Sequence, residues 1–157
     1  MVLVGFNLRA ETAANITGDL KGSDGAVYNP SLAWSLGFDC DLVWGIKTNL
    51  QCNETIRLFD SEVGGDAQTD IEAGTDVTAT RITASLSKKF LRDELEIKAS
   101  AIWEIESGAA LVMPAVTWAK DDIAVELSGG IFVGDTGGLF GQFHDNSFVK
   151  AAITYTF

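Results

Sequence analysis

The clearest pattern along the chain is an alternation of apolar and polar residues with a period of two. In residues 148–157, Val149, Ala151, Ile153, Tyr155 and Phe157 alternate with Phe148, Lys150, Ala152, Thr154 and Thr156. The same alternation runs through residues 42–51, 95–105 and 123–133. Because successive side chains of a β-strand point to opposite faces, this pattern predicts strands with one apolar face and one more polar face.

Weaker alternation in four further segments completes the predicted fold. These segments are residues 2–11, 28–39, 76–87 and 109–119. We therefore expect an all-β protein, an antiparallel up-and-down meander of about eight long strands. Each predicted strand has about ten residues or more, whereas strands of soluble proteins have roughly five or six and strands that cross a bilayer about nine to eleven. The expected fold is a transmembrane β-barrel or a segment of one.

The predicted connections alternate in length. Turns are expected at 39–41, 88–94 and 120–122, and long loops at 12–27, 60–75 and 134–147, with a short connection at 106–108 on the side of the long loops. Transmembrane barrels have short turns on the periplasmic side and longer loops outside. This alternation therefore supports the same fold class.

Composition limits the alternatives. The chain has 157 residues and a net charge of -11, which argues against nucleic acid as a partner, because a phosphate-binding surface needs clustered cations. The sequence contains no run of eighteen apolar residues, so it predicts no transmembrane helix. No basic segment followed by an apolar one opens the chain. We expect residues 1–157 to be a single outer-membrane domain, the C-terminal portion of a longer barrel.

The residues with chemical potential form no recognisable catalytic or metal-binding pattern. His144 is the only histidine, and its neighbours Asp145 and Ser147 lie in the same glycine-rich segment without a convergent partner. The acidic segment 60–76 lacks the spacing of a calcium loop, which leaves a solvated loop or divalent cations bridging it to lipid head groups. We expect no enzyme activity, no metal site and no cofactor.

The two cysteines are expected to remain apart. If Cys40 lies in a turn and Cys52 well along the next strand, they are roughly 30 Å apart at about 3.3 Å per residue. A disulfide needs Cα atoms within about 7 Å. Both are therefore interpreted as free thiols, or as partners of cysteines in another chain.

Charged residues concentrate on the more polar of the two predicted faces. The candidates for the interior of a barrel are Arg9, Lys47, Arg81, Lys98, Glu104, Glu126 and Lys150. In a closed eight-stranded barrel they would form a paired polar core, because such a barrel leaves no open pore. In a larger barrel they would line a water-filled channel and bias ion passage. At the turn end, Trp44, Trp118, Tyr155 and Phe157 are expected to form an interfacial aromatic girdle.

Residues 148–157 resemble the C-terminal signature by which outer-membrane barrels of Gram-negative bacteria are recognised for assembly. The signature falls on Val149, Ala151, Ile153, Tyr155 and Phe157. Residues 111–157 also resemble the tail of large porin-like outer-membrane proteins, with a proline-bearing strand, a short Asp turn and a glycine-rich strand. The resemblance implies an outer-membrane location, lipid and the barrel-assembly machinery as partners, and a passive channel as the function.

Two other functions remain open at this point. The chain could be a membrane-anchored structural or adhesion barrel that acts through its outer loops. It could also be a soluble, lipocalin-like barrel with its apolar side chains turned inward around a ligand. Strand length and the polar content of the second face argue against the soluble barrel.

Overall fold

The computed structural model describes residues 5–135 and 138–157, and the described part is one antiparallel sheet. Its strands are β1 (Phe6–Asn15), β2 (Ser31–Leu42), β3 (Ile46–Arg57), β4 (Thr78–Phe90), β5 (Leu95–Glu104), β6 (Ala110–Lys120), β7 (Ile123–Val133) and β8 (Phe148–Tyr155). Three 3-10 segments, η1 (Val43–Gly45), η2 (Asp60–Glu62) and η3 (Gly141–Asn146), lie in the connections. The prediction of an all-β meander is confirmed.

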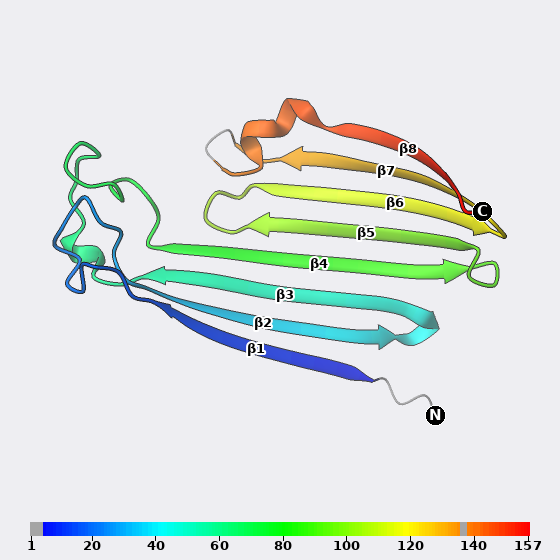
Figure 1. The fold of residues 1–157 in the computed structure, drawn as a ribbon, viewed down its shortest axis with the longest axis horizontal. Coiled ribbons are helices and arrows are strands. Elements are labelled where there is room, and N and C mark those ends of the chain that lie inside the picture. Colours follow the sequence, from blue (N-terminus) through cyan, green and yellow to red (C-terminus); the bar gives the residue numbers. More distant parts are fainter. Residues whose placement is uncertain (1–4, 136–137) are drawn as a thin grey trace.

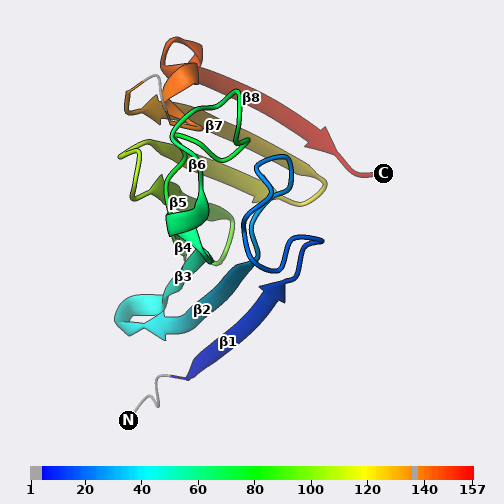
Figure 2. The ribbon, with the colours of Figure 1, turned by 90° about the vertical axis from the view of Figure 1, so that its left-hand side faces the viewer.

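Strand neighbours follow chain order from β1 to β8, and every pair is antiparallel (Figure 1). The sheet curves but does not close, so β1 and β8 form its two edges within the described residues (Figure 2). It therefore fits a segment of a barrel or an open barrel.

All the long connections lie at one end of the sheet. This loop end carries residues 16–30, 58–77, 105–109 and 134–147, of which 136 and 137 lie outside the described residues. The opposite turn end carries η1, residues 91–94 and residues 121–122, together with the C-terminus (Figure 1). The alternation of short and long connections is thus confirmed.

The turn predicted at residues 39–41 is wrong. Asp39 and Asp41 are typical turn residues, but here they lie within β2, opposite Asn49 and Lys47 on β3. The alternation of Phe38, Cys40 and Leu42 carries the strand past them. An acidic residue on the polar side of a strand costs little, so the apolar alternation determines where the strand ends.

The true turn is η1, and it corrects the predicted position of Trp44. Trp44 and Gly45 have φ angles of 65° and 72°, which lie in the left-handed region. Trp44 is therefore not a strand residue, and its side chain is 80% exposed. Left-handed backbone is costly for a bulky residue, which is why the sequence pattern did not indicate a turn here.

The first strand also lies further along the chain than predicted. β1 begins at Phe6 and ends at Asn15, whereas the prediction was 2–11, of which residues 2–4 lie outside the described part. Residues 12–15 have little hydrophobicity, but each is paired with a residue of β2, from Thr12 opposite Trp34 to Asn15 opposite Ser31. Pairing with a neighbouring strand extends β1 where alternation is weak.

The register separates the sheet into two chemically different faces. The apolar face carries one row across seven strands: Leu8, Phe38, Leu50, Ala84, Ala101, Val112 and Ile131. Among the strand residues, the register places only Glu54, Lys88 and Lys120 as charged residues on this face. The polar face carries the remaining charged strand residues.

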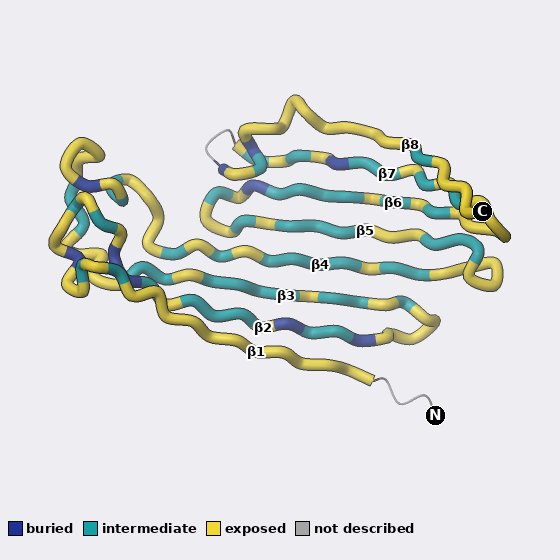
Figure 3. Tube along the Cα trace, viewed as in Figure 1, coloured by how far each residue is buried: buried dark blue, intermediate teal, exposed yellow. Residues whose placement is uncertain are grey.

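The sheet has almost no conventional core. Among the described residues, Cys40 and Ala109 are the only buried hydrophobic residues, and no large side chain is fully buried. Most of each strand is exposed or half-buried (Figure 3). An apolar face without a covering layer needs a partner, because exposed apolar patches of this extent are rare on soluble monomers.

Pro114 occupies a strand without disrupting the sheet. It pairs with Ala99 on β5, while the ladder between β6 and β7 is interrupted between the pairs Val112–Ile131 and Ala115–Ser128. Proline has no N–H to donate, so the interruption falls where the missing donor would have been needed.

Candidate functional site

The candidate functional site is the polar face together with the loop end. All seven charged residues proposed for a barrel interior lie on the polar face by register: Arg9, Lys47, Arg81, Lys98, Glu104, Glu126 and Lys150. Whether they line a pore stays a prediction.

Arg9 is held in place by its neighbours on β2. Its guanidinium pairs with Asp39 at 2.7 Å. Its side chain lies over Gly37, where an added Cβ would come within 3.4 Å of the arginine Nε. Asn49 on β3 also donates to the Asp39 carboxylate. The result is a charged network across β1, β2 and β3, partly open to solvent.

Glu104 joins three separate segments. Its carboxylate pairs with Arg81 on β4 at 3.1 Å and accepts hydrogen bonds from the Ser107 hydroxyl at 3.2 Å and the Leu139 backbone N–H at 3.0 Å. A buried or half-buried carboxylate needs such partners. This residue therefore ties the sheet to the connections on either side of β6 and β7.

The three lysines of the candidate set lie in one row of the sheet. Lys47 is opposite Ser87, Ser87 opposite Lys98, and the row continues through Ala115 and Ser128 to Lys150. No carboxylate of the described residues lies within ion-pair distance of these three amino groups. Glu126, one row nearer the turn end, accepts a hydrogen bond from the Ser128 hydroxyl at 2.9 Å.

Hollows occur on the polar face. One, of about 480 Å³, lies near the turn end and is lined by Asp39, Lys47 and Ser85 among others. Another, of about 440 Å³, lies near the loop end beside Arg81 and Glu104. The polar face is therefore the hollowed side of the curved sheet.

The proposed assembly signal divides between the last strand and the residues after it. Val149, Ala151, Ile153 and Tyr155 lie on the apolar face, opposite residues of β7. Phe157 lies beyond the end of β8 and is fully exposed. Nothing in the structure tests their role in assembly.

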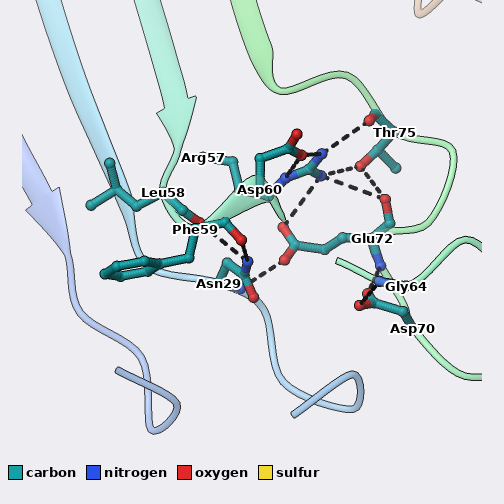
Figure 4. Close-up of polar contacts among 9 residues, drawn as sticks. All are labelled: Asn29, Arg57, Leu58, Phe59, Asp60, Gly64, Asp70, Glu72 and Thr75. Atoms are coloured by element: carbon teal, nitrogen blue, oxygen red, sulfur yellow. Dashed lines mark hydrogen bonds and ion pairs between the residues drawn. The ribbon is translucent and has the colours of Figure 1, made fainter. Parts of the chain in front are cut away.

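A cluster of polar residues lies at the loop end, and we call it the loop clasp: Asn29 and Asp70, which are the buried polar residues of the described part, with Arg57, Asp60, Glu72 and Thr75 (Figure 4). Arg57 is at its centre, with its side chain only 8% exposed. The guanidinium forms ion pairs with Asp60 at 2.6 Å and with Glu72 at 3.8 Å. It also donates a hydrogen bond to the Thr75 hydroxyl at 2.6 Å.

The loop clasp also joins the two long loops to each other. Glu72 accepts a hydrogen bond from the Asn29 backbone N–H at 2.7 Å, and the Asn29 amide donates to the Leu58 and Phe59 carbonyls. Backbone N–H groups of Gly64 and Glu72 donate to Asp70 and lower the pKa of its carboxyl. The acidic segment is thus folded around internal donors.

A second fixed carboxylate lies in the connection between β5 and β6. Burial opposes its ionisation, but the side chain and backbone N–H of Thr80 and the hydroxyl of Thr78 donate to Glu106 and hold its pKa at about 2. The Thr80 contacts are both 2.7 Å. Glu106 thereby fastens this connection to the start of β4.

The remaining candidates for chemistry are not assembled into a site. The His144 imidazole lies 3.0 Å from Asp145, whereas the Ser147 hydroxyl donates to the His144 carbonyl and not to its ring. Within residues 5–135 and 138–157, no group of three metal-ligating side chains is arranged to hold an ion.

The cysteines are both free thiols. Cys40 is in β2 and not in a turn, opposite Thr48, while Cys52 is opposite Leu36. They lie on the same face of adjacent strands but four residues out of register, which separates them by roughly 13 Å at about 3.3 Å per residue.

Comparisons with other proteins do not assign the chain to a family. No family model, curated protein or solved structure matches it. In the part of the chain that the structure describes, no helix is long and apolar enough to cross a membrane.

Proposed function

We propose that this chain is an outer-membrane β-barrel protein, or part of one, that works as a porin-like passive channel. The observation that carries the proposal is the contrast between the two faces of the sheet. Leu50, Ile97 and Ile131 lie on the apolar face with 45%, 46% and 48% of their surface exposed. Their environment in a folded protein has to be apolar, because exposed hydrophobic surface in water is unfavourable.

Lipid is the environment that fits the dimensions of this face. The strands have 8 to 13 residues, and about nine to eleven residues cross a bilayer at a steep tilt. Trp34 and Trp103 lie near the loop end of the apolar face, and Trp118 and Tyr155 near its turn end. Aromatic girdles at both interfaces are typical of transmembrane barrels.

The polar face suits water. By register, charged residues lie on this face in every strand except β6, and the hollows are on this side. A soluble lipocalin-like barrel requires the opposite arrangement, with the apolar face on the hollowed side. The distribution of charge therefore favours a water-filled interior over a ligand-binding apolar one.

The alternative of a membrane-anchored barrel acting through its loops is favoured by one observation. The loop clasp folds residues 16–30 and 58–77 onto each other through a nearly buried Arg57, which makes a defined surface at the loop end (Figure 4). Defined outer loops are compatible with a channel as well, so the channel remains the first proposal.

Reconstitution tests the proposal. The protein encoded by the whole natural reading frame that contains these residues, purified in detergent, would be inserted into planar bilayers and into liposomes loaded for swelling assays. We expect stepwise conductance and entry of small sugars, both of which need a continuous aqueous path. A protein that stays soluble without detergent contradicts the membrane location. A protein that inserts into the bilayer but does not conduct contradicts the channel and favours the membrane-anchored barrel.

A further inference from the structure

The polar face is interrupted by an apolar corner at the loop end. Ile102, Leu111 and Phe132 lie opposite one another on β5, β6 and β7, in a row of the polar face. All three are half-buried. Apolar side chains on the water-facing side of a barrel need a cover of their own, because lipid cannot reach them.

The cover is η3. The rings of Phe132 and Phe143 have their centroids 5.8 Å apart at an interplanar angle of 50°, a favourable tilted arrangement. Because Phe132 belongs to the polar face, this contact places η3 over that face and not outside the sheet. Beside it, the Phe148 ring lies over Gly130, where an added Cβ would come within 2.4 Å of the ring.

The connection that carries η3 is fixed to the sheet on both sides. Leu139 donates its N–H to Glu104, which is itself paired with Arg81. Gly138 packs so closely on Ser107 and Ala109 that a Cβ would come within 2.6 Å, and Ala109 is fully buried. Such close approaches indicate a built contact, since only glycine allows them.

We infer that η3 is a fixed constriction on the water side of the sheet, seated on Phe132, that limits the size of the solute passing the loop end. This inference rests on the proposed channel and identifies η3 as the element that sets the width of that channel. Phe143, 42% exposed, packs its ring against Phe132 at the apolar corner, and Glu104 anchors the approach to η3. Gln142, His144 and Asp145, which flank Phe143, are exposed at the same mouth.

Two substitutions test the inference: Phe143→Ala and Phe132→Ala, each of which removes one ring of the same contact. The control is Phe59→Ala, in another loop at the loop end, whose ring makes no aromatic contact within the described residues. The first readout is cleavage by chymotrypsin at Leu139 and Phe140 in detergent. Because an aromatic pair is worth about 0.5–1.5 kcal/mol, each variant should be cleaved roughly two- to twelvefold faster than the unaltered protein.

The second readout is channel width, measured by single-channel conductance and by liposome swelling with neutral sugars of increasing size. Both variants should conduct more and admit larger sugars, while Phe59→Ala should do neither. Faster cleavage with unchanged conductance and size limit overturns the constriction but leaves the channel. Unchanged cleavage also overturns it. An unaltered protein without any conductance overturns the channel, and the constriction with it.

Discussion

Trp34 and Glu54 lie directly opposite each other on β2 and β3, and the indole N–H of Trp34 donates to the Glu54 carboxylate. The pair lies on the apolar face, where Glu54 is the only acidic strand residue. If the apolar face meets lipid, as proposed, a carboxylate there is costly without a donor. The indole therefore makes this charge tolerable near the loop end, where an interfacial tryptophan is expected.

We predict that Trp34→Phe destabilises the folded protein by about 1–3 kcal/mol, because the carboxylate loses its donor while the aromatic surface remains. The measurement is urea unfolding from lipid vesicles. The double variant Trp34→Phe/Glu54→Leu should recover most of the loss, since it removes the orphaned charge as well. Equal stability of Trp34→Phe and the unaltered protein would show that Glu54 finds water instead.

The loop clasp leads to a second prediction. Arg57→Gln should leave the sheet intact but loosen residues 16–30 and 58–77 together, because Glu72 would remain with little exposure and no cation. We expect a loss of about 1–3 kcal/mol in local stability, measured as faster protease cleavage within both loops. Lys21→Gln, at an exposed position of the first loop, is the control. Loosening of only one loop would argue that Arg57 does not join them.

Glu106 makes the connection between β5 and β6 sensitive to acid. Its pKa is about 2, below the ordinary value of 4.5, so its contacts stabilise the folded state fully above pH 4.5. That contribution is lost as the pH falls from 4.5 towards 2. The protection factor of the Thr80 amide hydrogen, which corrects its exchange rate for the intrinsic pH dependence, should therefore fall in this window, and Glu106→Gln should remove this change. Titration of Glu106 near pH 4.5 would contradict the proposed hydrogen bonds.

The sequence predicted the parts of the fold that depend on local alternation. β7 was predicted with its observed bounds, because apolar residues alternate without interruption from Ile123 to Val133. β1 was misplaced because its alternation is weak. The turn after β2 was misplaced because the acidic residues Asp39 and Asp41 were interpreted as turn residues. In both places pairing with a neighbouring strand overrides local preference.

For the candidate site, the sequence predicted which residues share a face of the sheet, but not the contacts that depend on how the loops fold. The period of two places Arg81 and Glu104 on one face, and they meet because β4 and β5 are neighbours in the chain. The contact between Asn29 and Glu72 joins residues far apart in the sequence, and no local pattern indicates it. The same holds for the contact between Phe132 and Phe143, because it depends on how the loop after β7 folds back onto the sheet.

The terminal residue leads to a fourth prediction. Phe157→Asp should lower the amount of protein assembled in the outer membrane without changing the conductance of the molecules that do assemble, because Phe157 lies beyond β8 and is fully exposed. Heat-modifiable protein in membrane fractions measures assembly. Leu91→Asp, at an exposed turn of the same end, is the control. Equal yields for both variants would show that the ending is no assembly signal.

The last prediction concerns the two edges, β1 and β8. The sheet curves too gently to bring them together (Figure 2). Unpaired backbone groups in lipid cost several kcal/mol each, so strands other than these two must cover the edges in a membrane. We therefore expect that the 157-residue chain alone does not close on itself in detergent.

A disulfide test decides between closure and open edges. The register leads across the sheet from Phe6 on β1 to Val149 on β8. Self-closure with a shear of about eight would bring Ala10 opposite Ile153 and keep the apolar face continuous. With Cys40 and Cys52 replaced by serine, Ala10→Cys/Ile153→Cys should form no intramolecular disulfide, whereas Leu8→Cys/Phe38→Cys, paired in the structure, should form one. A cross-link between β1 and β8, with continuous protection of both edges from hydrogen exchange, would instead establish a complete eight-stranded barrel. Its interior would then be a packed polar core, because eight strands leave no open channel.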